Sequence, residues 1–321
     1  MVGSKNSWKA WLYLSPAIIL LLIFTVWPII NSLIMAFSDG YNAAKAVTGT
    51  TYPPGIANFI HVFKPEGGLF PGTGMTGDFR LGALGNTILL TVITVPVSTI
   101  LALIIAVALN SIKPLQKLYQ TIFFLPYVTN SIAIGMVFNT IFSTPASGNS
   151  VGIFNTLLTP IYFLFGIEDP INWMNSATSP YWALIFVTSV YIIWNALPFK
   201  ILILMGGLQS ISNQYYDAAK VDGTSKFRVF TRITVPLLSP MLSYVIITSF
   251  IGGFKEYSSI VGLFDAEMAE GGKLATIVGY VYQQMADNSE GVAAAAALVL
   301  FVIIFAVTMV NLYVSKKNTH Y

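Results

Sequence analysis

Six long stretches of this chain carry no charged residue, and all six are rich in apolar side chains. They cover residues 10–38, 81–112, 118–167, 170–199, 233–254 and 291–315. A helix needs roughly 20 residues to cross the hydrocarbon core of a bilayer, so each stretch is long enough to span a membrane. Only 9% of all residues are charged, against about 25% in ordinary soluble domains. These stretches therefore predict an all-α membrane protein rather than a soluble domain.

The charge-free stretches divide into six predicted transmembrane helices. We place them at Trp11–Phe37, Leu84–Leu109, Tyr119–Phe142, Trp182–Leu208, Leu237–Ile260 and Val292–Val314. The remainder of the third stretch, Val151 to Ile167, is short and contains Asn155 and Pro160, which favours an interfacial or re-entrant helix. The first apolar run is too long for a signal peptide, so we expect it to be retained.

The positions of the charged residues predict which side of the membrane each loop faces. Cytoplasmic loops are enriched in Lys and Arg. With both termini cytoplasmic, the inner segments would hold ten cations: Lys5, Lys9, Lys113, Lys117, Lys220, Lys226, Arg228, Arg232, Lys316 and Lys317. The outer segments would hold only Lys45, Lys64, Arg80 and Lys273, together with most of the acidic residues, including Glu168, Asp169, Asp265, Glu267, Glu270, Asp287 and Glu290. The charge distribution thus predicts that both termini are cytoplasmic.

This topology divides the chain into four parts. Residues 1–37 form a cytoplasmic N-terminus and the first transmembrane helix, and residues 38–80 an outer loop that is either a compact cap or a mobile segment. Residues 81–315 form the core transmembrane domain with a cytoplasmic loop at 209–236, and residues 316–321 form a cytoplasmic tail.

Several chemistries lack the residues that they require. The chain has no Cys, and its two histidines, His61 and His320, lie in a predicted loop and in the tail. We therefore expect no metal site, thiol chemistry or disulfide, and a net charge of +3 is too small for a nucleic-acid binder. A Gly-rich phosphate loop is also missing, so any ATP would be bound by another polypeptide.

The loop between the fourth and fifth predicted spans carries the most specific pattern. Tyr215, Ala218, Ala219 and Asp222 share one face of a short helix at i, i+3, i+4 and i+7 spacing. Gly223 then supplies the backbone freedom that ends a helix. The pattern predicts a helical knuckle whose two alanines let a partner surface approach closely.

This loop resembles the EAA motif of permease subunits in binding-protein-dependent ABC importers. Asp217-Ala218-Ala219, Gly223 and the segment Ile233 to Pro236 match that motif, with Asp in place of the usual Glu. The resemblance extends from Gly82 to the C-terminus and is greatest to the maltose and glycerol-3-phosphate importers, through segments such as Phe124-Leu125-Pro126 and Gly207-Leu208-Gln209.

The resemblance implies a type I ABC importer fold with six transmembrane helices in a bacterial cytoplasmic membrane. The chain itself would not be an enzyme and would bind no cofactor. Its partners would be a second homologous permease subunit, a dimer of ATP-binding subunits that carry ATP and Mg, and an extracytoplasmic solute-binding protein. Coupling to the ATPase would use Tyr215, Asp217, Ala218, Ala219, Asp222 and Gly223.

Polar and aromatic residues at similar depths in three spans predict the substrate cavity. Intramembrane polar groups usually face a bundle interior or a watery cavity, and a carbohydrate needs both hydrogen bonds and an aromatic face. Depth along the helices and the resemblance together select Tyr127, Ser131, Trp194, Asn195, Phe199, Ser249, Gly253, Lys255 and Glu256. We expect an oligosaccharide, with glycerol-3-phosphate or a uronate next, since Lys255 could attract an anion.

Other interpretations of these residues stay open. Tyr127, Trp194 and Phe199 could be packing residues, and Lys255 and Glu256 could mark the end of a span. Lys200 is expected to extend to the membrane surface or to contact a neighbouring subunit. Pro96, Pro126 and Pro198 are expected to kink their helices. The alternative function is an ATP-independent secondary transporter or channel for a small polar solute. An intramembrane enzyme would lack the necessary chemical groups.

Overall fold

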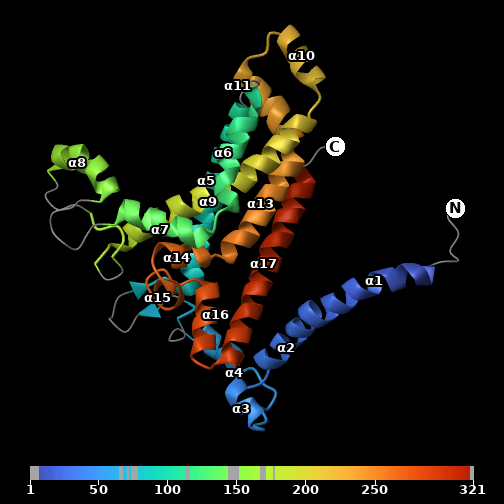
Figure 1. Cartoon of the computed structure of the whole chain (residues 1–321), viewed down its shortest axis with the longest axis vertical. Coiled ribbons are helices and arrows are strands. Elements are labelled where there is room, and N and C mark those ends of the chain that lie inside the picture. Colours follow the sequence, from blue (N-terminus) through green and yellow to red (C-terminus); the bar gives the residue numbers. More distant parts are fainter. Residues whose placement is uncertain are drawn as a thin grey trace.

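The chain folds into a bundle of long helices flanked by shorter ones (Figure 1). The computed structural model describes residues 7–64, 68–70, 72–73, 79–112, 116–143, 152–166, 171–175 and 178–318. Lys5, Lys113, Glu168, Asp169 and His320, used above for topology or residue roles, lie outside these ranges. Within them, four helical segments are long and apolar enough to cross a membrane, or six if each of two bent helix pairs counts as one span.

The first span is a helix that departs from the rest of the bundle. It comprises α1 (Ser7–Leu21), a π-helical turn η2 (Leu22–Val26) and α2 (Trp27–Ala36). The most apolar window of this span is not buried within the chain. Figure 1 shows α1 projecting away, while α2 packs against the C-terminal helix α17 (Glu290–Asn318).

The predicted outer loop contains folded elements. These are α3 (Ala43–Val47), α4 (Ala57–Phe63) and a two-stranded hairpin of β1 (Gly72–Thr73) and β2 (Phe79–Arg80). The buried amide of Asn58 donates hydrogen bonds to the carbonyls of Ala36 and Ser38 at 3.1 and 2.8 Å, which ties α4 to the end of α2.

Two long helices form the centre of the bundle. They are α5 (Gly82–Ser111) and α9 (Tyr181–Ser210), which make the most extensive helix pair. Small and branched apolar side chains are buried where these helices pack, including Ala102, Ala106, Leu109, Ile201, Leu204 and Leu208. The predicted spans at Leu84–Leu109 and Trp182–Leu208 agree closely with these helices.

The predicted third span, Tyr119–Phe142, is not one straight helix. It consists of α6 (Gln116–Val128) and α7 (Ser131–Phe142), which meet at 98°. The bend follows from capping, because the side chain of Asn130 accepts a hydrogen bond from the backbone N–H of Ile132 at 2.8 Å and starts a new helix there. Pro126 lies within α6, before the break.

The fifth span begins with several short turns and ends earlier than predicted. It runs through α11 (Lys226–Val229), η4 (Phe230–Thr234), α12 (Val235–Leu237) and α13 (Ser239–Phe254), with a 69° bend before α13. The expected end at Ile260 is wrong, because the backbone of Lys255 caps α13 through the carbonyls of Gly252 and Gly253. Residues near Ile260 belong to a separate helix, α14 (Ser258–Leu263).

The remaining helices lie around the ends of the bundle. The short apolar helix α8 (Ile153–Phe165) occupies the stretch expected to be interfacial or re-entrant. Figure 1 places α10 (Asn213–Val221) at the same end of the bundle as the C-terminal end of α17. The opposite end holds α3, α4 and α16 (Ile277–Ala286), with α15 (Ala266–Glu270) nearby.

Candidate functional site

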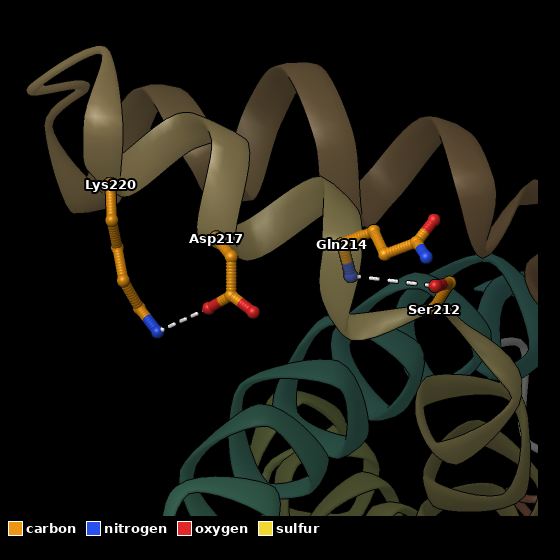
Figure 2. A network of polar contacts seen from close by, with 4 residues as sticks. All are labelled: Ser212, Gln214, Asp217 and Lys220. Atoms are coloured by element: carbon orange, nitrogen blue, oxygen red, sulfur yellow. Dashed lines mark hydrogen bonds and ion pairs between the residues drawn. The ribbon is translucent and has the colours of Figure 1, made fainter.

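The helix α10 is bounded by local hydrogen bonds that its sequence encodes. At its start, the hydroxyl of Ser212 accepts the backbone N–H of Gln214 at 3.4 Å (Figure 2). At its end, Gly223 adopts a positive φ of 64°, and the N–H of Thr224 reaches the carbonyl of Ala219 at 2.9 Å. Glycine is suited to this left-handed position because it has no Cβ. The predicted knuckle is thus a capped helix with a defined turn after it.

The predicted face of α10 borders a groove. Its volume is about 430 Å³, and it is lined by Ser212, Gln214, Tyr215, Ala218, Ala219, Asp222, Thr224 and Ile233. Tyr215, Ala218, Ala219 and Asp222, the four residues grouped by helical spacing, therefore lie along one groove. Ala219 is buried, whereas Tyr215 and Ala218 are exposed and accessible to a partner.

Asp217 belongs to a different part of the α10 surface. Its carboxylate pairs with the ammonium of Lys220 at 2.8 Å, and Figure 2 shows both side chains projecting from the helix on the same side. Both are well exposed, so the ion pair contributes little to stability. Nearby, the hydroxyls of Tyr216 and Thr234 lie 3.3 Å apart and connect α10 to η4.

A second cavity lies between α5, α6, α9 and α13. Its volume is about 300 Å³, and its lining combines hydroxyl, amide, aromatic and charged side chains: Thr94, Val95, Ser98, Tyr127, Ile192, Asn195, Ala196, Phe199, Lys200, Thr248, Ser249, Gly252, Gly253 and Glu256. Six residues predicted to bind substrate are among them, namely Tyr127, Asn195, Phe199, Ser249, Gly253 and Glu256.

Aromatic rings form one part of this cavity. Tyr127 of α6 and Phe199 of α9 stack with ring centroids 5.7 Å apart and an interplanar angle of 21°. Tyr127 is about half exposed. Since the rings come from different helices and also line an open cavity, they join the helices and add apolar surface to the cavity lining.

Three predicted substrate residues lie outside the cavity lining. Trp194 packs against Phe138 of α7, with ring centroids 5.3 Å apart, within an apolar cluster. Ser131 begins α7, and its carbonyl accepts the hydroxyl of Tyr191. Lys255 is exposed at the end of α13. The structure therefore gives Trp194 and Ser131 packing environments.

Lys200 lies in the cavity wall, where we did not expect it. Instead of extending to a surface, its side chain is buried, with only 4% of the residue exposed. Its ammonium donates to the hydroxyl oxygens of Ser98 and Thr99 of α5 at 2.6 and 3.2 Å. The expectation that Lys200 reaches the membrane surface is wrong, because two hydroxyls on the facing helix provide hydrogen-bond acceptors inside the bundle.

The sequence of α5 contains a pattern that predicts a polar surface on the side of the cavity where Lys200 lies. Five buried hydroxyl residues recur along one side of that helix: Thr87, Thr91, Thr94, Ser98 and Thr99. Each donates to the backbone carbonyl four residues earlier, which is how such groups are satisfied in apolar helices. Of these, Thr94 and Ser98 line the cavity, and Ser98 and Thr99 accept from Lys200 of α9.

Glu256 lies beyond the end of α13 and lines the cavity. Its carboxylate oxygen Oε1 accepts the backbone N–H of Ser259, in the first turn of α14, at 3.1 Å. The residue therefore does more than mark the end of a span, since it links the cavity to the start of α14.

Curated proteins of similar sequence are permeases. The chain is 29% identical over 307 residues to the "Arabinooligosaccharides transport system permease protein AraP" of Bacillus subtilis, covering 95% of this chain and 88% of AraP. It is 30% identical over 325 residues to the "Probable ABC transporter permease protein YesP" of the same species, and the match covers 99% of this chain and 93% of YesP. The lactose transport system permease protein LacF of Rhizobium radiobacter is 26% identical over 313 residues, and the match covers 97% of this chain and 95% of LacF.

Solved structures share the fold. One is a crystal structure of "a bacterial ABC transporter involved in the import of the acidic polysaccharide alginate", with a TM-score of 0.77, 21% identity and 98% of both chains covered. A structure of bacterial alginate ABC transporter in complex with an alginate pentasaccharide-bound periplasmic protein gives a TM-score of 0.74 at 23% identity, covering 98% of this chain and 96% of that one. At these identities, the likeness is one of fold.

A family assignment follows from the match over the greater part of the chain. Residues 95–320, which include α10 and the cavity-lining residues of α9 and α13, match the family described as "Binding-protein-dependent transport system inner membrane component". This chain therefore belongs to the family of inner-membrane components of binding-protein-dependent transport systems.

Proposed function

We propose that this chain is a transmembrane permease subunit of an ATP-driven, binding-protein-dependent carbohydrate importer. It forms half of the translocation pathway, and its substrate is an oligosaccharide. The observation that carries the proposal is the presence of two separate sites in one member of this family. One is the exposed groove on α10 and the other is the polar and aromatic cavity within the bundle.

The groove on α10 is proposed to dock the ATP-binding subunit. Exposed Ala218 lets a partner backbone approach closely, while Tyr215 and Asp222 provide a ring and a carboxylate on the same face. The contact between Tyr216 and Thr234 transmits a displacement of α10 to η4 and so toward α13. Because α13 contributes Thr248, Ser249 and Gly253 to the cavity, motion at α10 can change the cavity's shape.

The cavity is proposed to hold the sugar during translocation. Tyr127 and Phe199 supply apolar ring faces for the C–H surface of a sugar, and Asn195 supplies both hydrogen-bond donors and an acceptor. The relatives AraP and LacF are named as permeases for arabinooligosaccharides and for lactose, which supports a carbohydrate substrate.

The proposed assembly places α10 and both termini in the cytoplasm of a bacterium. Four cations lie in α10, α11 and η4, namely Lys220, Lys226, Arg228 and Arg232, which agrees with a cytoplasmic side. The other components are a second permease subunit, a pair of ATP-binding subunits that carry ATP and Mg, and an extracytoplasmic binding protein.

A growth and uptake experiment tests the substrate class. A strain that lacks this chain is supplied with the wild-type gene or with an empty vector and is given labelled neutral and acidic oligosaccharides, one at a time. We expect at least one oligosaccharide to accumulate only when the chain is restored and the binding protein is present. If restoration changes the uptake of no carbohydrate in the panel, the carbohydrate assignment is incorrect.

A further inference from the structure

We propose that Lys200 recognises a carboxylate on the transported sugar, so that the cavity selects acidic, uronate-containing oligosaccharides over neutral ones. This inference rests on the proposed function and specifies the substrate class of the same cavity. It is carried by the position, the burial and the hydrogen bonds of Lys200.

The hydrogen bonds of Lys200 occupy two of the three N–H donors of an ammonium group. The hydroxyl of Ser98 donates its proton to the carbonyl of Thr94, and the hydroxyl of Thr99 donates to Val95 at 2.7 Å. Both hydroxyl oxygens therefore face Lys200 with lone pairs, and they accept from it at 2.6 and 3.2 Å. An ammonium has three N–H donors, so a third donor stays available to a ligand in the cavity that Lys200 lines.

Lys200 has no counter-ion of its own in the described part of the chain. Among those residues, the ion pair found within 4.0 Å joins Lys220 and Asp217, far from the cavity in sequence. A buried charge without an opposite charge is costly, and ionisable residues inside the membrane mark functional sites by default. An anionic ligand would remove that cost when it enters the cavity.

The carboxylate that shares the cavity is engaged elsewhere. Glu256 accepts the N–H of Ser259 at the start of α14, which holds its Oε1 toward that helix. Glu256 and Lys200 line one cavity but lie beyond ion-pair distance of each other. Lys200 on α9 is therefore the group in this lining that can pair with an anionic ligand.

The rest of the lining fits a sugar that bears this carboxylate. Phe199 directly precedes Lys200 in α9 and stacks with Tyr127, so a ring face and a cation lie in the same wall. Asn195 and Thr248 add neutral polar groups for hydroxyls. A bare inorganic anion would use the cation alone, whereas a uronate uses the ring, the neutral polar groups and the cation together.

The test compares acidic sugars with their neutral counterparts in direct binding. The complete transporter, assembled with its partner subunits in lipid nanodiscs without the binding protein, is titrated with di- to tetrasaccharides of galacturonate, glucuronate and mannuronate. Each is compared with the same oligosaccharide after its carboxylates have been reduced to hydroxymethyl groups. The variants are Lys200→Met, Lys200→Arg and, as a matched control, Lys45→Met, which removes an exposed lysine from α3.

We expect wild type to bind at least one uronate about tenfold more tightly than its reduced form, the effect of a single charge-assisted contact. Lys200→Met should abolish this preference, while Lys200→Arg and Lys45→Met retain it.

Wild-type transporter that binds the reduced sugars as tightly as the uronates overturns the inference but leaves the carbohydrate function intact. Unchanged preference in Lys200→Met also overturns it, as that result assigns recognition to another group. Absence of binding by wild type to acidic and reduced sugars alike also overturns the inference, and the uptake panel tests the proposed function separately. The wild-type comparison decides the inference even if Lys200→Met fails to assemble.

Discussion

Gly135 of α7 lies directly against the backbone of Gly262 in α14. A Cβ atom on Gly135 would be 2.4 Å from the carbonyl carbon of Gly262, and one on Gly262 would be 3.0 Å from the Cα of Ile132. This contact seats the second half of the bent span on α14, the helix that follows Glu256. Small residues allow such close approach of helices in membranes.

Replacing Gly135 with Ala should destabilise the protein, because α7 must move away from α14 to admit the methyl group. We expect a loss of roughly 1 to 3 kcal/mol, measured as a lower thermal midpoint of the purified chain. Gly206→Ala is the matched control, since Gly206 lies within α9 and a Cβ there meets nothing within 4 Å. That variant should be unchanged or slightly more stable. Equal behaviour of the two variants would show that the glycine contact is unimportant.

Much of the bundle was predictable because hydropathy reports directly on helices that cross a membrane. The structure has α5, α9 and α17 within a few residues of their expected bounds. The bend between α6 and α7 was missed because it depends on one capping side chain, Asn130, inside an uninterrupted apolar run. A hydropathy average over a whole span hardly changes when one residue in it is polar, so it does not reveal a cap.

The α10 groove was predictable from helical spacing, but the cavity was predictable only in part. The position of a residue along a helix predicts its depth in the membrane but not the direction in which its side chain points. Trp194 and Asn195 were therefore both predicted to bind substrate, although of the two only Asn195 lines the cavity and Trp194 packs against Phe138. The position of Lys200 depends on hydroxyls of α5, a helix about 100 residues away in sequence, as its 2.6 Å bond to Ser98 shows.

Asn195 and Trp194 provide a test of the cavity with adjacent residues. Asn195→Leu should reduce the rate of sugar uptake by about tenfold, because it removes hydrogen bonds that orient the substrate, and should leave thermal stability nearly unchanged. Trp194→Leu should lower stability, because it removes a ring from the cluster with Phe138. Uptake per folded molecule and the thermal midpoint separate the two effects. The reverse result, with Asn195→Leu harming stability alone, would argue against a substrate role for the cavity.

Gly223 and Gly166 test whether the turn after α10 has a role beyond folding. Both glycines end a helix with positive φ, 64° and 63°, and in both a Cβ would meet nothing within 4 Å. Substitution by Val therefore imposes a similar backbone strain at each position. We expect only Gly223→Val to reduce uptake strongly, because it alone alters the helix proposed to dock the ATPase. Equal uptake losses in both variants, measured at equal protein in the membrane, would assign the effect to general strain.

The most direct test of the account is uptake by the reconstituted transporter when the α10 groove is blocked. Proteoliposomes that contain this chain, its partner subunits and the binding protein are given labelled oligosaccharide with or without ATP inside, and Ala218→Leu is compared with Ala44→Leu. Both alanines are exposed in short helices, but only Ala218 lines the groove. We predict ATP-dependent uptake by wild type and Ala44→Leu, and a loss of more than about tenfold in Ala218→Leu with normal membrane insertion. Wild-type rates in Ala218→Leu, or equal uptake by wild type without ATP, would contradict the central claim that α10 couples ATP hydrolysis to import.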